Sequence, residues 1–225
     1  MIILKKLLYK PYILFEKIVS RLRRPGLSTY PIRSIRRLHG KKLLTISDKL
    51  HLGCGMSPID GFINIDAVNL PGVDLRCGLN RLRDYFPDES ISEIYICHAL
   101  EHFSWREIPL YLEQFKTLLK PGGILRISVP DISKVMGIAS RDNLSFKDVK
   151  MLAGIIGGGQ DHYYNFHKAF FWPDLLSCLL DDEGFVDIEE YSAHPHFTGE
   201  NVIDGSLAGI NIFGASISVN MMARK

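Results

Sequence analysis

The stretch Lys49-Leu-His-Leu-Gly-Cys-Gly55 indicates a short buried strand that runs directly into two glycines. Glycine after a strand lets the backbone turn sharply and approach a ligand closely. The third glycine of a dinucleotide-binding fingerprint would fall at position 58, where the chain has Pro58. The complete Gly-x-Gly-x-x-Gly pattern is therefore absent, which argues against a nicotinamide-dependent dehydrogenase.

Working outward from this stretch, short apolar runs alternate with longer helical patterns, which is typical of an α/β sheet. The pattern predicts strands at 49–52, 62–65, 73–76, 93–97, 124–129, 186–191 and 217–223. It predicts helices at 105–119, 133–140, 146–156 and 173–182, and an amphipathic helix over 2–22 that is interrupted at Pro11. A second short basic segment follows at 32–44.

Three further motifs follow the glycines in a fixed order. They are Phe62-Ile-Asn-Ile-Asp66, Ile94-Tyr-Ile-Cys-His-Ala-Leu-Glu-His102 and Leu118-Leu-Lys-Pro-Gly-Gly-Ile-Leu-Arg-Ile-Ser-Val-Pro130. Together with the glycine stretch, they make residues 49–131 resemble the class I S-adenosylmethionine-dependent methyltransferases of the type 11 group. The resemblance implies a Rossmann-like α/β fold with a mostly parallel sheet of seven strands, in which the last strand, 217–223, is antiparallel.

The resemblance also implies S-adenosylmethionine as the cofactor and a set of residues that contact it. Gly53 and Gly55 match the loop that wraps the amino-acid portion of the cofactor, and Asp66 matches the acid that binds both ribose hydroxyls. A carboxylate suits a vicinal diol because its two oxygens accept two charge-assisted hydrogen bonds. Residues 98–100 match the loop beside the sulfonium. The expected cofactor contacts are Leu52, Gly53, Cys54, Gly55, Asp66, Asp74, Cys97, His98 and Ala99.

The chain departs from the family pattern at two places. Asp66 lies only 11 residues after Gly55, although a parallel crossover usually needs a dozen or more residues. The sequence therefore predicts a turn at 57–60 in place of the first crossover helix. Related chains also often carry an acid for the adenine amino group near the position of Gly78, and Asp74 is the nearest acid here.

Methyl transfer from a sulfonium is an in-line displacement that needs a general base only if the acceptor must lose a proton. Histidine is the usual base at neutral pH, so the candidate catalytic residues are His98, His102, His162 and His167. For His98 the alternative is a strand-end cap, and for His102 the alternative is a structural cap at a helix start.

The segment 157–167 combines a run of glycines with polar and aromatic residues. A similar Gly-Gly-Gln followed by Asn-x-His recurs in chains that resemble this one, which favours an acceptor-binding role over a packed loop. The expected substrate contacts are Gln160, His162, Tyr164 and His167. Asp161, His162 and His167 offer no closed four-ligand zinc set, so the sequence predicts no metal site.

The net charge of +2 over 225 residues hides two unlike parts. Residues 1–47 contain 12 Lys or Arg and a single acid, Glu16, whereas residues 48–225 contain 15 basic and 24 acidic residues. We therefore expect a basic helical arm and linker over 1–45 and a methyltransferase domain over 46–225. The arm could pack on the acidic body, contact a membrane surface through residues 1–24 or bind RNA, and its apolar face favours the first two.

The sequence thus predicts a methyltransferase that acts on a small-molecule or carbohydrate-like acceptor, with nucleic acid disfavoured as a partner. The acceptor class follows from the resemblance and from the lack of a recognisable nucleic-acid module. A non-catalytic cofactor-binding module and an RNA methyltransferase guided by the arm are the alternatives. Four cysteines without a Cys-x-x-Cys pair, and no apolar run of membrane-spanning length, favour a cytoplasmic location. The inner face of the membrane is the alternative location.

Overall fold

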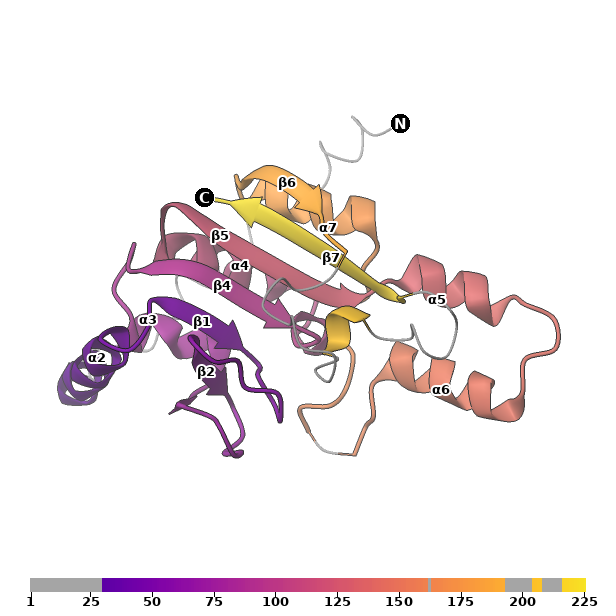
Figure 1. Ribbon diagram of the computed structural model, residues 1–225, viewed down its shortest axis with the longest axis horizontal. Coiled ribbons are helices and arrows are strands. Elements are labelled where there is room, and N and C mark those ends of the chain that lie inside the picture. The colour runs from indigo at the N-terminus through magenta and orange to yellow at the C-terminus, as the bar shows by residue number, and fades with distance from the viewer. Residues whose placement is uncertain (1–29, 162, 193–203, 208–215) are drawn as a thin grey trace.

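The described strands form one mixed sheet. The computed structural model describes residues 30–161, 163–192, 204–207 and 216–225, with side chains described from residue 36 onward (Figure 1). The strands are β1 (Lys49–Leu52), β2 (Ile63–Asp66), β3 (Leu75–Arg76), β4 (Ile91–Cys97), β5 (Leu119–Pro130), β6 (Val186–Glu190) and β7 (Ser218–Arg224). Their order across the sheet is β3-β2-β1-β4-β5-β7-β6.

The strand pairing confirms the predicted topology. β1 lies between β2 and β4 and is parallel to both, with Leu50 opposite Ile63 on one side and Ile94 on the other. β7 is antiparallel to β5 and to β6. The carboxyl ends of the parallel strands therefore gather at one edge of the sheet, which is where open α/β sheets bind their ligands.

Both faces of the central strands are buried, which explains their nearly continuous apolar sequence. In β4, Ile94 and Ile96 belong to the main hydrophobic core, whereas Tyr95 packs with Ile59 and Phe62 in a second, smaller cluster. Successive side chains of a strand point to opposite faces, so these two clusters lie on opposite sides of the sheet.

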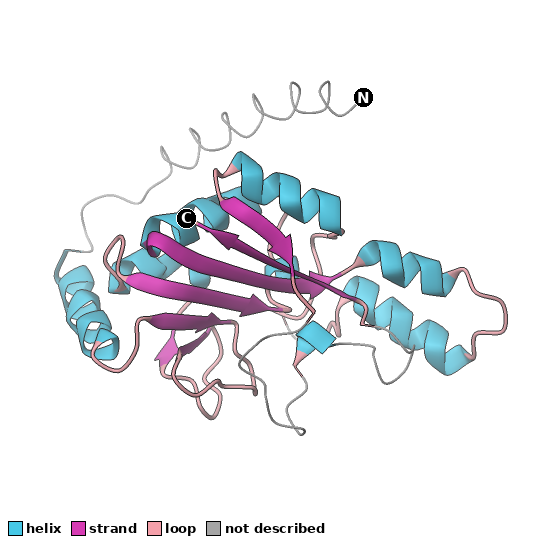
Figure 2. Cartoon of the chain, turned by 45° about the horizontal axis from the view of Figure 1, so that its top comes forward, coloured by secondary structure: helices cyan, strands magenta, loops and turns pink. Residues whose placement is uncertain are grey.

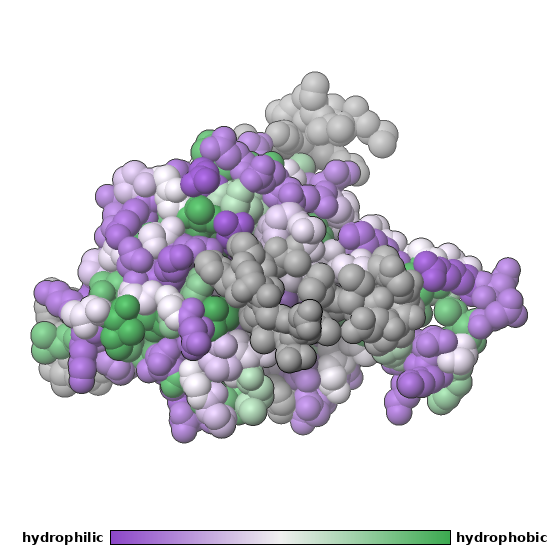
Figure 3. Space-filling model, in the orientation of Figure 1, coloured by the Kyte–Doolittle hydropathy of each residue, from purple (hydrophilic) through white to green (hydrophobic). Residues whose placement is uncertain are grey.

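Helices cover the sheet and extend beyond it (Figures 1 and 2). They are α2 (Tyr30–Leu44), α3 (Leu82–Tyr85), α4 (Ile108–Leu118), α5 (Ile132–Ala139), α6 (Phe146–Gly157) and α7 (Pro173–Asp182). Short 3-10 turns are η1 (Leu79–Arg81), η2 (Leu100–His102) and η3 (Gly205–Leu207). α4 buries Ile108, Leu112 and Phe115 on one helical face against the core. α5 and α6 form a hairpin that projects from the end of β5, and Figure 3 shows hydrophilic residues over much of its outer end.

Several boundaries differ from those that the sequence predicts. The helix predicted at 105–119 begins at Ile108, because the Ser104 amide and hydroxyl both donate to the Glu107 carboxylate and hold a turn before it. β5 begins at Leu119 instead of residue 124, because Leu119 already pairs with Ile91. β3 is shorter than the predicted 73–76. β1 and α7 have the predicted bounds, and the described crossover from β1 to β2 contains turns in place of a helix, as predicted.

The last part of the basic segment packs on the sheet domain. Leu43 of α2 lies in the main core, and the Arg36 guanidinium contacts the Asp84 carboxylate at 2.9 Å. A β-carbon at Gly40 would lie 2.1 Å from the Tyr85 carbonyl oxygen, so α2 approaches α3 at its backbone. The helix predicted over 2–22 lies outside the described residues. Within the described part of the chain, no helix has the length and apolarity needed to cross a bilayer.

Candidate functional site

The glycine loop after β1 requires glycine at its first position. Gly53 has a φ of +65°, a conformation that side chains rarely adopt, and a β-carbon there would lie 2.5 Å from the Ala99 β-carbon. The Gly53 and Cys54 amides both donate to the Ile65 carbonyl, at 2.8 and 3.2 Å. The loop therefore lies directly between β2 and the segment that follows β4.

Asp66, at the end of β2, is joined to this loop through its carboxylate. Its Oδ2 accepts a hydrogen bond from the Gly55 amide at 3.0 Å, and its Oδ1 accepts one from the Val68 amide at 2.8 Å. Gly55 has a φ of +52° and open space where a side chain would stand. The structure thus brings together Gly53, Gly55, Asp66 and Ala99, four of the residues that the sequence predicts to contact the cofactor.

The other predicted cofactor residues occupy varied environments. Leu52 is fully buried, so only its backbone could contact a ligand. Burial raises the pKa of the Cys54 and Cys97 thiols to about 12, which keeps both protonated at neutral pH and unsuited to nucleophilic attack. The Asp74 carboxylate accepts hydrogen bonds from the backbone amide of Asn64 at 2.8 Å and from the side-chain amide of Asn64 at 3.2 Å.

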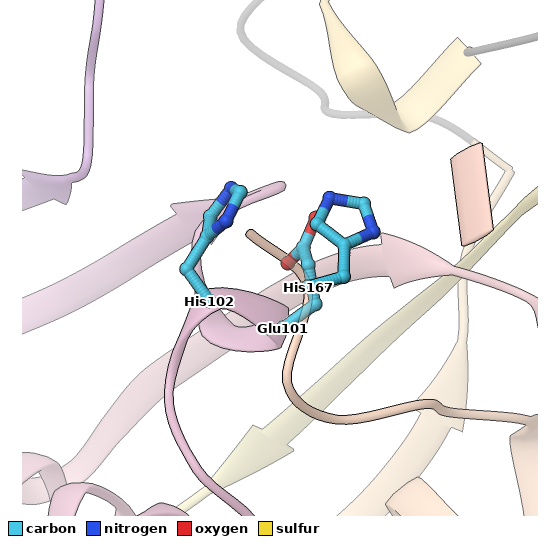
Figure 4. Close-up of side chains that lie close together, drawn as sticks. All are labelled: Glu101, His102 and His167. Carbon is cyan, nitrogen blue, oxygen red and sulfur yellow. The ribbon is translucent and has the colours of Figure 1, made fainter. Parts of the chain in front are cut away.

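A histidine–glutamate cluster, made of His98, Glu101, His102 and His167, lies at the end of β4. The Glu101 Oε1 atom is 3.5 Å from His98 Nδ1 and 3.9 Å from His167 Nε2. The His102 and His167 rings meet edge to face, with centroids 4.9 Å apart. Figure 4 shows that the Glu101, His102 and His167 side chains extend to the same side of the η2 turn.

Backbone hydrogen bonds bring His167 to this cluster from a distant part of the chain. The amides of Lys168 and Ala169 both donate to the Glu101 carbonyl, at 2.8 and 3.2 Å. The His167 amide also donates to the Gly157 carbonyl at 3.1 Å, which closes the loop after α6. Three of the four predicted catalytic histidines therefore lie together, and His162 lies outside the described residues.

Burial dominates the electrostatics of the cluster. The Glu101 side chain is only 1% exposed, and burial raises its pKa to about 8. Burial lowers the pKa of His98 and of His167 to about 4, so both imidazoles are neutral at physiological pH. Neutral imidazoles retain a lone pair that can accept a proton or bind a cation.

Comparison with solved structures identifies the fold. The structure of an S-adenosylmethionine-dependent methyltransferase from Archaeoglobus fulgidus aligns with a TM-score of 0.51 at 13% identity. The alignment covers 95% of this chain and 99% of that one. The chain has the fold of an S-adenosylmethionine-dependent methyltransferase.

Two further methyltransferase structures, one of them of a possible enzyme, align less well. A possible histamine N-methyltransferase from Thermotoga maritima has a TM-score of 0.48 at 17% identity and covers 95% of this chain and 99% of its own. The 1,6-didemethyltoxoflavin-N1-methyltransferase from Burkholderia thailandensis has a TM-score of 0.47 at 16% identity and covers 96% of this chain and 89% of its own. No protein-family model matches the chain, and no curated protein is significantly similar in sequence.

Within this methyltransferase fold, the predicted substrate residues divide between the surface and the cluster. Gln160 has a φ of +56°, and its side-chain amide donates to the Gly157 carbonyl at 3.1 Å. Tyr164 is exposed and meets Tyr163 edge to face, whereas His167 belongs to the cluster.

Glu101 is the site residue that sequence reasoning missed. In the sequence it looked like part of a helix-starting Glu-His pair. A signal was nevertheless present, because Glu101 follows a strand directly and stands beside the apolar pair Ala99 and Leu100. Glutamate is rarely fully buried unless it is paired, so an acid in such a setting directs attention to the groups around it.

Proposed function

We propose that the chain transfers a methyl group from S-adenosylmethionine to a small-molecule or carbohydrate-like acceptor. The observation that carries the proposal is the pairing of the Gly55 amide with the Asp66 carboxylate at the carboxyl edge of β1 and β2. This arrangement offers turned backbone to the amino-acid part of the cofactor. It also offers an acid with two oxygens to the ribose diol.

The reaction would be an in-line displacement in which the acceptor atom bonds to the methyl carbon and the carbon–sulfur bond breaks, leaving S-adenosylhomocysteine. Positioning of donor and acceptor would supply much of the acceleration. An acceptor that must lose a proton would need a base, and the described candidates are His102 and the neutral imidazoles of His98 and His167. His162 stays a candidate from the sequence.

Support for a small or sugar-like acceptor comes from the loop that ends at His167. Tyr163, Tyr164 and Phe166 expose 77%, 53% and 41% of their surface, and they lie in the same segment as Gln160. Flat aromatic faces beside hydrogen-bonding groups suit the faces and hydroxyls of a sugar ring. We propose that this loop contacts the acceptor.

Calorimetric titration with S-adenosylmethionine and S-adenosylhomocysteine tests the cofactor assignment. Asp66→Ala should weaken binding about 100-fold, because two charge-assisted hydrogen bonds to the ribose are lost. Asp60→Ala, an exposed acid in the same crossover, should bind as the unchanged chain does. Equal affinities for the two variants would reject the assignment of Asp66.

An assay with methyl-labelled cofactor and fractionated cell extract tests catalysis and the acceptor class. Label in small molecules or glycans supports the proposal. Cofactor binding without any transfer would instead support a non-catalytic module. Label in RNA that disappears when residues 1–45 are deleted would support an RNA methyltransferase guided by the basic arm.

A further inference from the structure

The nitrogen atoms of His98 and His167 that face Glu101 are hydrogen-bond acceptors. His167 Nδ1 lies 2.8 Å from the Ile155 carbonyl oxygen. A carbonyl can only accept, so Nδ1 must carry the hydrogen and Nε2 must carry the lone pair. That Nε2 atom is the one that faces the Glu101 carboxyl group.

His102 and His98 have their tautomers assigned in the same way. His102 Nδ1 lies 3.3 Å from the Phe166 carbonyl oxygen, which places the lone pair on Nε2. The Ser218 hydroxyl donates its hydrogen to the Gly205 carbonyl at 2.6 Å, so it must accept from His98 Nε2, 2.9 Å away. The lone pair of His98 therefore sits on Nδ1, 3.5 Å from Glu101 Oε1.

The Glu101 carboxyl group lies opposite these imidazole lone pairs. The Glu101 side chain is buried, and neither carboxyl oxygen has a hydrogen-bond partner among the described residues. A carboxyl group without a hydrogen-bond partner is costly to bury, and the raised pKa of Glu101 keeps a proton on it at neutral pH. A cation that displaces this proton would accept electron pairs from the carboxylate and from the facing imidazole nitrogens.

We propose that Glu101, His102 and His167 bind a divalent transition-metal ion of the zinc type. Their ligand atoms all lie within 4.8 Å of one another. Ligands about 2.1 Å from a zinc ion lie roughly 3.4 Å apart in tetrahedral geometry, so small side-chain rotations would close the site. Two imidazoles and one carboxylate are a donor set that suits zinc, iron or cobalt and leaves coordination positions open.

The hydrogen bonds of the cluster histidines match those that orient the histidine ligands in known metal sites. Histidines that bind metals usually donate their other ring N–H to a backbone carbonyl or carboxylate, which fixes the ring and its tautomer. His102 and His167 do this through the carbonyls of Phe166 and Ile155. The rings are therefore already oriented for an ion.

The site lies beside the glycine loop. His98 precedes Ala99, and a β-carbon on Gly53 would lie 2.5 Å from the Ala99 β-carbon. If the proposed methyl transfer is correct, on which this last step rests, an open coordination position would take an oxygen of the acceptor. The metal site itself does not depend on the methyl transfer.

A metal titration of the full chain tests the proposal. The chain is stripped with a chelator and titrated with Zn²⁺ by calorimetry, and with Co²⁺ while its visible absorption is followed. We expect one ion per chain and cobalt bands of a nitrogen and oxygen site. Glu101→Gln and His167→Gln should each weaken binding at least about 30-fold. His39→Gln, an exposed histidine on α2, should leave the affinity unchanged.

Circular dichroism and thermal unfolding establish that each variant is folded. Because His167 lies nearer the surface than Glu101, it gives a second variant if Glu101→Gln does not fold. The proposal is overturned if the chain takes up no stoichiometric ion, or if both variants bind Zn²⁺ as tightly as His39→Gln. The titration needs no S-adenosylmethionine, so its failure is distinct from failure of the cofactor assignment.

Discussion

The glycine loop and the histidine–glutamate cluster lie at the ends of neighbouring strands and are built in opposite ways. In the loop, the amides of Gly53, Cys54 and Gly55 all have acceptors, and both Asp66 oxygens have donors. In the cluster, the buried Glu101 carboxyl group has no hydrogen-bond partner among the described residues. The polar groups of the loop are paired without a ligand, whereas the buried carboxyl group of the cluster is not.

This difference separates two kinds of binding site. A loop whose own groups are paired is held in place before its ligand arrives, which lowers the ordering cost of binding. A buried carboxyl group without a hydrogen-bond partner carries a desolvation cost that a bound cation would offset. The predictions below perturb one region at a time, from the largest expected effect to the smallest.

Gly53→Val should disrupt the loop most strongly. The left-handed backbone and the clash with Ala99 together should lower the free energy of unfolding by about 4 kcal/mol, and cofactor binding should be lost. Urea unfolding and calorimetry measure the two effects. Gly61→Ala is the control, because Gly61 has a φ of +80° but open space around it, so it carries the backbone strain alone. Equal losses in the two variants would contradict a role for the Ala99 contact.

His51, in the strand that leads into the glycine loop, should make the stability of the fold sensitive to acid. His51 is buried, donates to Asn64 Oδ1 at 3.2 Å and stacks on Tyr95. Burial lowers its pKa from 6.5 to about 4. Between these values the unfolded chain binds a proton that the folded chain does not, so stability is full above pH 6.5 and falls as the pH drops toward 4.

The lowered pKa of His51 should reduce the free energy of unfolding by about 3 kcal/mol between neutral pH and pH 4. His51→Phe keeps a ring against Tyr95 and takes up no proton, so its unfolding free energy should fall less steeply over this interval. Urea unfolding at a series of pH values measures the slope. An unchanged slope would mean that His51 titrates normally in the folded chain.

Replacing a hydrogen-bonded carboxylate by its amide should cost more than replacing a carboxyl group that has no hydrogen-bond partner among the described residues. Asp66→Asn keeps one acceptor but turns an amide N–H toward a backbone donor, so the free energy of unfolding should fall by about 2 kcal/mol. Glu101→Gln in metal-free protein should change it by less than about 1 kcal/mol, because no described hydrogen bond to the carboxyl group is lost. A larger loss of unfolding free energy for Glu101→Gln than for Asp66→Asn, measured by chemical denaturation, would contradict this difference between the two regions.

Loosening the loop that carries His167 should have a smaller effect than the change at Asp66. The Asn165 side chain donates to Asp161 at 2.6 Å and accepts from the Gly159 amide at 3.3 Å. Asn165→Ala should lower the free energy of unfolding by about 1 kcal/mol and weaken zinc binding about fivefold. Lys150→Ala on α6 is the exposed control. Zinc affinity that stays constant in Asn165→Ala would show that the loop does not position His167.

The sequence predicted the glycine loop far better than the cluster. Gly53 and Gly55 follow β1 and Asp66 ends β2, and a parallel pair in register must bring these ends together. His167 and Glu101 are separated by α4, β5, α5 and α6, and they meet through hydrogen bonds to the Glu101 carbonyl. Sequence spacing carries no information about such a contact.

The sequence by itself therefore determined the α/β class, the strand that ends in two glycines and the acid that faces them, because these depend on local periodicity and on neighbouring strands. Only the tertiary structure decided that three of the four predicted catalytic histidines surround one buried glutamate. It also decided which nitrogens of His98 and His167 face that glutamate. Burial, tautomer and the missing hydrogen-bond partner are properties of the surroundings of Glu101, and those surroundings come from four separate parts of the chain.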